Sequence, residues 1–376
     1  MVPFGTAMKR RNFFAATTGL ALMPTPTTAA EDRQVMANSD GAPLSAEEYA
    51  RLLLKLAPKV QKDSFSRDGV VTELEKRVAE SFGKEYAVWL PTGTLANHMA
   101  VRLLAGNRRR VLVQAESHLY NDCGDCVQTL SNLNMVPLAP GKATFTLDEV
   151  QEMAHRGDGG RVAVPIGAIQ IETPVRRQQG EHFDLKELKK ISAWAKEHKV
   201  GMHLDGARIY LEAGHTKVPV REYAALFDTV YVSMYKYFNA ASGAILAGPR
   251  ALLENVYHPR RMFGGGLHEV WPFAAVALHY FDGFDQRYRR AVDTAETVIA
   301  TLAKDGNFEI ERIPRGTNIF RLRLRGVNGL VYQQRLLLAG VTAAEPVNEW
   351  FTLRVNETWN RATAAEIADR FRKAMG

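Results

Sequence analysis

The chain has 376 residues, 46% hydrophobic and 24% charged, enough to bury a full core without disulfides in two domains, or in one large domain with an appendage. Its net charge of +7 raises the question of nucleic-acid binding, but the densest basic run outside the N-terminus, at 108–110, is short and has no interleaved aromatic residues. We therefore expect a globular protein that binds no nucleic acid.

The first thirty residues have the pattern of an export signal. Basic residues at 9–11 precede a short apolar run at 13–23 and a small-residue stretch that ends at Ala30. The apolar run is too short, and too interrupted by Thr and Pro, to span a bilayer. The order RRNFF at 10–14 resembles a twin-arginine signal, the alternative being a disordered basic tail. We expect a signal peptide at 1–30, export to the periplasm and no membrane anchor after its removal.

Residues 31–45 are polar and contain Gly and Pro, so we expect a mobile linker there. The folded part then begins near residue 46. Residues 72–83 and 94–106 have apolar positions at helical spacing and end at glycines. Residues 184–199 predict another helix, because Asp184 and Glu187 have the spacing of a capping box.

Short apolar runs between these helices predict buried strands. They lie at 86–90, 111–114, 162–172, 201–205, 229–235 and 243–248. Strands that alternate with helices favour an α/β fold with a mostly parallel sheet. In such sheets ligands bind beyond the carboxyl ends of the strands, so residues that directly follow these runs are the candidates for a site.

Three such positions carry suitable chemistry, each with a structural alternative. Thr92-Gly93-Thr94 starts a helix, where free N–H groups favour a phosphate, although an ordinary helix N-cap has the same residue types. Lys236 follows a strand. Its amine is either desolvated there, and so able to act as a nucleophile, or it extends to solvent. Asp205 ends another strand and either pairs with a protonated ring nitrogen or caps the next helix.

Taken together, these positions match the needs of one cofactor. Pyridoxal phosphate requires a phosphate cradle, a ring-stacking side chain, a carboxylate for its pyridinium nitrogen and a lysine for the Schiff base. The chain offers them in that order as Gly93-Thr94, His118, Asp205 and Lys236. The sequence therefore predicts a pyridoxal-phosphate enzyme that acts on an amino acid.

Several motifs resemble those of the threonine aldolase/β-eliminating lyase family of fold-type-I pyridoxal-phosphate enzymes, from about residue 64 to the C-terminus. LPTGTLANHMAVR resembles the family's phosphate loop, ESHLY its A-H-x-Y, HLDGARIY its H-x-D-G-A-R, SMYKY its S-K-G and RRMFGGG its basic triple-glycine loop. GTN at 316–318 and LRV at 353–355 resemble the family's small domain. The resemblance implies a cofactor-binding large domain at 46–285 and a small α+β domain at 286–376.

The resemblance also implies roles for individual residues. Thr92, Gly93 and Thr94 would bind the phosphate, His118 would stack on the ring, and Asp205 would pair with the ring nitrogen. Arg208 would contact the cofactor's polar edge, Lys236 would form the Schiff base, and Arg354 would clamp the substrate α-carboxylate. Family members assemble so that neighbouring subunits complete each other's sites, so we expect a homodimer or homotetramer.

The sequence also departs from the family pattern. Tyr235, Tyr237 and Phe238 replace small residues beside the lysine, and Val175 stands where the family's E-N-T-H has histidine. The family's N-terminal S-D-T-V segment has no clear match. The resemblance thus implies intact cofactor chemistry and altered substrate contacts.

The expected activity is that of a threonine-aldolase-like lyase, which cleaves a β-hydroxy L-amino acid into glycine and an aldehyde, with His118 as the remaining candidate base. Two alternatives remain open. One is another pyridoxal-phosphate reaction on amino acids, namely β-elimination, racemisation or transamination. The other is a cofactor-binding protein with weakened catalysis.

The two cysteines, Cys123 and Cys126, form a C-x-x-C pair where the family has glycines. A zinc site would need a second pair, and the setting of a thioredoxin motif is missing. Inert thiols, a disulfide and a redox or metal role all remain open, and we expect no complete metal site.

Overall fold

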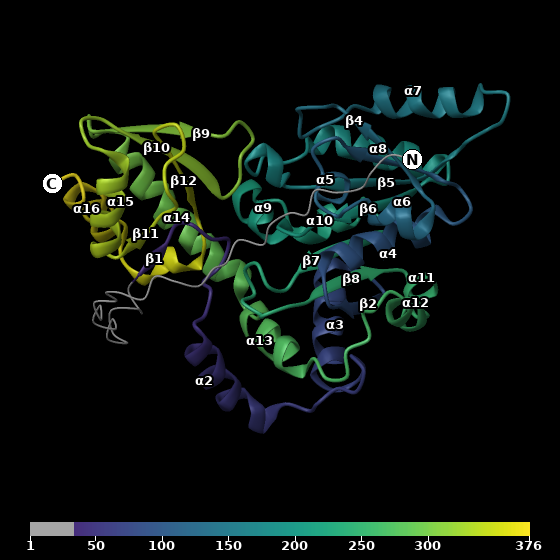
Figure 1. The fold of residues 1–376 in the computed structure, drawn as a ribbon, viewed down its shortest axis with the longest axis horizontal. Helices are drawn as coiled ribbons and strands as arrows, with labels where there is room; N and C mark the ends of the chain where they lie inside the picture. Colours follow the sequence, from purple (N-terminus) through teal and green to yellow (C-terminus); the bar gives the residue numbers. More distant parts are fainter. Residues whose placement is uncertain (1–33) are drawn as a thin grey trace, which may run out of the picture.

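The computed structural model describes residues 34–376. The signal peptide predicted at 1–30 lies outside the described residues. Figure 1 shows two lobes side by side, a larger one built on a central sheet and a smaller one that contains the C-terminus. Within the described part of the chain, no helix has both the length and the apolar character needed to cross a bilayer.

The larger lobe is built on a seven-stranded sheet with the order β2-β8-β7-β6-β5-β3-β4. Its strands are β2 (Tyr86–Leu90), β3 (Arg110–Gln114), β4 (Asn134–Leu138), β5 (Ile166–Glu172), β6 (Gly201–Asp205), β7 (Thr229–Ser233) and β8 (Ala244–Gly248). Neighbouring strands from β4 to β7 pair in parallel, and only β8 runs antiparallel to its two neighbours. The expected α/β fold with a mostly parallel sheet is therefore confirmed.

Every strand read from the sequence is present, with shifts at the ends. The sequence analysis did not predict β4, which contains Pro137. A strand at the edge of a sheet tolerates a proline, since one side of its backbone needs no ladder partner.

The larger lobe also contains helices, most of which lie around its sheet (Figure 1). They are α2 (Ala46–Leu56), α3 (Gly69–Phe82), α4 (Gly93–Ala105), α5 (His118–Asn121), α6 (Cys126–Ser131), α7 (Leu147–Asp158), α8 (Leu185–Glu197), α9 (Ile209–Thr216), α10 (Val220–Ala224), α11 (Arg250–Leu253), α12 (Tyr257–Met262) and α13 (Trp271–Phe281). The three predicted helices correspond to α3, α4 and α8. Asp184 caps α8 by accepting from the N–H groups of Lys186 and Glu187 at 2.8 and 3.1 Å. The predicted capping box is incomplete, because the Glu187 carboxylate instead accepts from the N–H of Leu147 at 3.1 Å.

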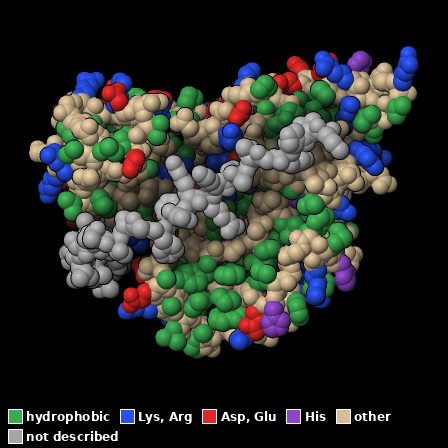
Figure 2. Space-filling model, viewed as in Figure 1, with side chains coloured by type: hydrophobic (Ala, Val, Ile, Leu, Met, Phe, Trp, Pro, Cys, Tyr) green, Lys and Arg blue, Asp and Glu red, His purple; other side chains and the backbone are tan. Residues whose placement is uncertain are grey.

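The smaller lobe holds an antiparallel sheet with the order β12-β10-β9, flanked by helices. Its elements are α14 (Phe284–Leu302), β9 (Phe308–Arg312), β10 (Ile319–Leu324), α15 (Gly329–Leu338), β11 (Val341–Thr342), β12 (Trp350–Arg354) and α16 (Ala364–Lys373). The face in Figure 2 carries its Lys and Arg side chains mainly around the rims of both lobes rather than in one patch.

The segment expected to be a mobile linker is instead part of the fold from Gln34 onward, so that prediction is wrong over 34–45. β1 (Val35–Met36) pairs in parallel with β11, and the side chains of Val35 and Ala37 are fully buried. Ser45 then caps α2 with a complete capping box. The polar composition of residues 31–45 suggested a linker, although Val35 and Ala37 are apolar alternate residues whose side chains face the core. We call residues 34–42 the N-terminal strap.

Candidate active site

A cavity of about 430 Å³ opens at the carboxyl ends of the parallel strands. Its lining is mostly charged or polar: Asp40, His118, Asp122, Glu172, Arg176, Asp205, Ala207, Arg208, Tyr235 and Lys236. Glu172 ends β5 and Asp205 ends β6, while Lys236 lies just beyond β7. The structure thus brings together four residues predicted from the sequence, which are His118, Asp205, Arg208 and Lys236.

Asp205 is held by a buried chain of hydrogen bonds. Its Oδ2 accepts from Asn97 Nδ2 at 2.6 Å, and Asn97 Oδ1 lies 2.8 Å from His203 Nε2. Burial lowers the pKa of His203 to about 4, so this ring is neutral and donates to Asn97. Helix α9 starts at Ile209 after Arg208 as its cap residue, so Asp205 does not cap it. Asp205 therefore presents a fixed carboxylate to the cavity.

Lys236 is partly buried and lines the same cavity. Burial and the nearby Arg208 guanidinium lower the pKa of its amine to about 8. The ammonium form is disfavoured in such a setting, so a reactive neutral amine is populated near neutral pH. The position fits a nucleophile better than an amine extended into solvent.

The aromatic residues beside Lys236 crowd it less than the sequence suggested. Tyr237 and Phe238 are buried and pack in the core against Phe284, with ring centroids 5.2 and 5.0 Å away. Only Tyr235 lines the cavity, where the Lys236 amine lies 5.4 Å from its ring centroid. Of the three replacements noted in the sequence, only Tyr235 can therefore alter contacts in the cavity, because the backbone turns after β7 and directs Tyr237 and Phe238 into the core.

Asp40, from the N-terminal strap, is a site residue that sequence reasoning missed. Its Oδ2 accepts from Arg208 Nε at 2.8 Å, and its Oδ1 accepts from Arg354 Nη1 at 3.1 Å and from Asn318 Nδ2 at 3.2 Å. Burial alone would raise the pKa of Asp40, but the two guanidinium groups hold it below its usual value. The dipeptide Ser39-Asp40 shares the first two letters of the family's S-D-T-V, which is the signal that could have found it.

His118 is anchored on several sides. Its backbone N–H donates to Glu172 Oε2 at 2.5 Å, and its Nδ1 lies 3.4 Å from Asp122 Oδ2. A hydrogen bond with Cys123 raises the pKa of the imidazole more than burial lowers it. Burial and the neighbouring Asp205 raise the pKa of Glu172 to about 7.

The segment in which the family has histidine supplies arginine instead. Val175 is fully buried, and the next residue, Arg176, lines the cavity. Arg176 pairs with Asp122, which also accepts from Arg177 Nη1 at 3.3 Å. Asp122 and Arg176 had not been singled out, since no motif marks them.

The predicted phosphate loop lies at the start of α4 and does not itself line the cavity. Thr92 caps this helix by accepting from the N–H of Leu95 at 3.2 Å. A Cβ on Gly93 would lie 2.0 Å from the Tyr231 hydroxyl oxygen, so this position requires glycine. Thr94 accepts from the thiol of Cys123 at 3.6 Å, which connects the loop to His118. Cys123 and Cys126 are both free thiols.

The donor set fits pyridoxal phosphate. It offers an amine with a lowered pKa, an anchored carboxylate, an arginine and an imidazole at one strand-end rim. Between Gln34 and Gly376, no cluster of three or more His, Cys, Asp or Glu side chains could hold a metal ion.

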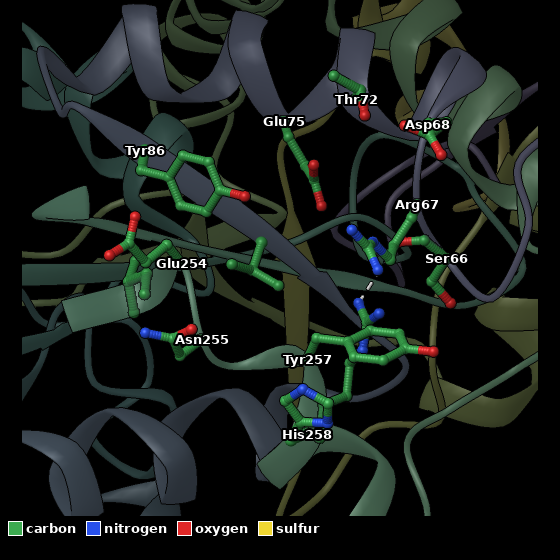
Figure 3. A pocket seen from close by; sticks show the side chains of 13 residues that line it. Ser66, Arg67, Asp68, Thr72, Glu75, Tyr86, Glu254, Asn255, Tyr257 and His258 are labelled. Carbon is green, nitrogen blue, oxygen red and sulfur yellow. Dashed lines mark hydrogen bonds between the residues drawn. The ribbon is translucent and has the colours of Figure 1, made fainter. Parts of the chain in front are cut away.

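A second cavity of about 420 Å³ contains none of the predicted cofactor or substrate residues, although Arg260 of the RRMFGGG loop lines it. Figure 3 shows the Glu75 carboxyl group pointing into it from α3, near Tyr86 and Arg67. Arg260 of the RRMFGGG loop is buried beside it and donates to the carbonyl oxygens of Trp89 and Phe65 at 2.7 and 3.0 Å. These contacts make Arg260 a structural residue that joins α12 to β2.

The chain resembles proteins of known sequence and structure. It is 29% identical over 216 residues to the low-specificity L-threonine aldolase of Saccharomyces cerevisiae, covering 57% of this chain and 55% of that protein. It is 28% identical over 217 residues to the alanine racemase TOXG of Cochliobolus carbonum, covering 57% of this chain and 55% of that protein. The matched part thus spans little more than half the length of these relatives.

The structure of a candidate L-allo-threonine aldolase from Listeria monocytogenes EGD-E superimposes with a TM-score of 0.75 at 23% identity, over 92% of this chain and 97% of that one. This likeness confirms the fold-type-I architecture of pyridoxal-phosphate enzymes. Residues 54–321 match the family described as Beta-eliminating lyase. With most of its length matched, the chain belongs to the beta-eliminating lyase family.

Proposed function

We propose that this protein is a pyridoxal-phosphate-dependent lyase that cleaves a β-hydroxy L-amino acid into glycine and an aldehyde. The observation that carries the proposal is the placement of Lys236, with its lowered amine pKa, in one cavity with the anchored Asp205 carboxylate. Membership of the beta-eliminating lyase family and the aldolase activity of its yeast relative support it.

Four single residues and one three-residue loop would hold the cofactor. Lys236 would bond to its aldehyde carbon, Asp205 would face its ring nitrogen, Arg208 its polar edge and His118 its ring face, while Thr92–Thr94 would receive the phosphate at the start of α4. When bound, the cofactor supplies a ring that accepts electrons from a bond broken at the substrate α-carbon.

The other steps fall to the chain's own residues. Arg354 binds the substrate α-carboxylate with its planar fork of N–H donors. Asn97 and the neutral His203 keep Asp205 oriented while charge develops in the cavity. His118 accepts the β-hydroxyl proton at Nε2, and Asp122 stabilises the resulting imidazolium at Nδ1.

The proposal is tested first by cofactor content and then by product identity. Purified protein should be yellow, borohydride should fix the cofactor to the Lys236 peptide, and Lys236→Ala should abolish both. Incubation with L-threonine and other β-hydroxy amino acids should release glycine and the matching aldehyde. A colourless protein that takes up no pyridoxal phosphate would disprove the assignment.

Racemisation is the second candidate. Two observations favour it, namely the similarity to an alanine racemase and the presence of Val175 where the aldolase motif has histidine. Incubation of single enantiomers of alanine and threonine separates the two functions. Inverted amino acid without free aldehyde would assign a racemase.

We further propose export by the twin-arginine route, with residues 1–30 as the signal peptide. A fusion of residues 1–45 to a folded reporter should reach the periplasm, and replacement of Arg10 and Arg11 by lysine should retain it in the cytoplasm.

We also propose a homodimer or homotetramer, and a division of the chain into a cofactor-binding domain at 46–285 and a small domain at 286–376. Light scattering of the purified protein measures its assembly. Limited proteolysis that cuts near residue 285 would support the division.

A further inference from the structure

The N-terminal strap (residues 34–42) joins the smaller lobe to the active site. Its backbone pairs with β11 through Val35 N and Ala37 N, which donate to Gly340 O and Thr342 O at 2.9 and 2.8 Å. Asn356 Nδ2 donates to the carbonyl oxygens of Met36 and Ser39 at 2.6 and 2.8 Å. The strap is therefore fixed along its length before it reaches the cavity.

At its far end the strap lies against the lysine segment. A Cβ on Gly41 would lie 2.4 Å from the carbonyl oxygen of Lys236 and 2.8 Å from the Cα of Tyr237. The N–H of Ala42 donates to Asn239 Oδ1 at 3.1 Å. Only a glycine permits so close a backbone approach without a shift of the lysine segment.

Between these anchors, Asp40 bridges two arginines from different lobes. Arg208 follows β6 in the larger lobe, and Arg354 ends β12 in the smaller one. The side chains of Arg208 and Asp40 are 11% and 10% exposed, and that of Arg354 is 26% exposed, so the bridge is mostly shielded from water. Each bond to Asp40 uses one nitrogen of a guanidinium group that has five N–H donors.

We propose that Asp40 is a positioning residue that aligns Arg208 and Arg354 as a pair for the carboxylate of the substrate, so that this subsite exists only with the strap docked. Two guanidinium groups placed together repel each other and are flexible, and the shared carboxylate fixes both. The three side chains together carry one net positive charge, which matches a single carboxylate. This inference rests on the proposed function, in which Arg354 receives the α-carboxylate.

Replacing the aspartate separates positioning from charge. In Asp40→Asn, the net charge of the cluster becomes more positive, which by itself would tighten anion binding. If positioning dominates, the released arginines bind a carboxylate more weakly despite the added charge. The direction of the change therefore decides between the two effects.

The experiment uses the cofactor-loaded protein and two measurements. Calorimetry gives the affinity for 3-hydroxybutyrate, which is threonine without its amine, and steady-state kinetics with L-threonine give KM and kcat separately. For Asp40→Asn we expect the affinity to fall about tenfold and KM to rise about tenfold, with kcat within about threefold of the wild type. Unchanged or tighter binding would overturn the inference.

Glu311→Gln is the matched control. It removes a carboxylate that pairs with Arg321 in the same small sheet, at 3.0 and 3.1 Å and away from the cavity lining. We expect wild-type affinity and KM from this variant. A KM shift equal to that of Asp40→Asn would mean that any lost ion pair in the smaller lobe has this effect, and would also overturn the inference.

Gly41→Ala is a second variant that leaves Asp40 in place and displaces the strap. It should raise KM for L-threonine in the same direction, and its far-ultraviolet circular dichroism should match the wild type. Wild-type binding by a folded Gly41→Ala protein would contradict a role for the docked strap. The proposed function fails if the wild-type protein forms no aldehyde. The positioning role is tested separately, by the ratio of the variant's affinity for 3-hydroxybutyrate to that of the wild type.

Discussion

At the scale of single residues, the site combines groups whose protonation is set by their surroundings. The Asp205 carboxylate is anchored by Asn97, and burial keeps the supporting ring of His203 neutral. Lys236 lies at the same rim without the bulk solvent that would favour its ammonium form. These environments give a carboxylate that stays in place beside an amine that can lose its proton.

The lowered pKa of Lys236 predicts how fast cofactor-free protein takes up pyridoxal phosphate. Only the neutral amine attacks the aldehyde, and with a pKa of about 8 the neutral fraction at pH 7 is about 300-fold larger than for a lysine at 10.5. The uptake rate, followed by absorbance, should rise about tenfold per pH unit below pH 8 and level off above it. Arg208→Gln should move the midpoint to higher pH, and a rate that keeps rising to pH 10 would contradict the depressed pKa.

At the scale of elements, close packing under the helix α4 fixes the loop at its start. Gly93 lies against Tyr231 of β7, and the phenol hydroxyl occupies the space of a Cβ. The glycine that motif reasoning assigned to a phosphate is thus also a packing requirement between α4 and the sheet.

The contact between Gly93 and Tyr231 predicts a loss of stability in Gly93→Ala. The added methyl group would overlap the Tyr231 oxygen, at a cost of about 1–3 kcal/mol in the free energy of unfolding. Urea denaturation measures this change. Gly306→Ala is the control, since nothing lies within 4 Å of its Cβ position, and it should change stability by less than about 0.5 kcal/mol. Equal effects of the two substitutions would exclude the packing explanation.

The sequence predicted these elements unevenly, for physical reasons. Buried strands such as β2 and β6 were predicted within a residue, because each is a short run with apolar side chains that is followed directly by a proline or a glycine. Asp205 and Lys236 followed from the rule that sites lie at strand ends. The sequence did not predict the N-terminal strap, because its apolar residues are few and its partners lie more than 300 positions later in the chain. Local sequence patterns contain no information about such a distant pairing.

At the scale of the whole molecule, buried carboxyl groups shape stability. Burial raises the pKa of Glu75 to about 8, and those of Glu172 and Glu212 to about 7. Each group ionises more readily in the unfolded chain than in the folded one. The folded state therefore loses stability as pH rises from the usual carboxyl pKa of about 4.5 through these values.

This linkage predicts that the free energy of unfolding falls between about pH 5 and pH 8, and that Glu75→Gln reduces the fall. In the wild type, Glu75 Oε1 accepts from the N–H of Trp89 at 2.7 Å. A glutamine keeps this acceptor oxygen but has no carboxyl group to titrate. We expect the variant to gain stability at pH 8 relative to the wild type, by on the order of a few kcal/mol, with little difference at pH 5. Denaturation curves at both pH values test this, with Glu254→Gln at the exposed rim of the same cavity as the control. A gain of equal size at both pH values would contradict the linkage.

The bridge from Asp40 to Arg354 also sets an order of events during synthesis. The two residues are separated by 314 positions, and β1 finds its partner β11 only after most of the chain has been made. A growing chain can form the parallel strands of the larger lobe early, but Asp40 can bind Asn318 and Arg354 only after residue 354 has been made. Chains that end before residue 341 therefore lack both the strand that pairs with β1 and the arginine that pairs with Asp40, and chains that end between 342 and 354 lack only that arginine.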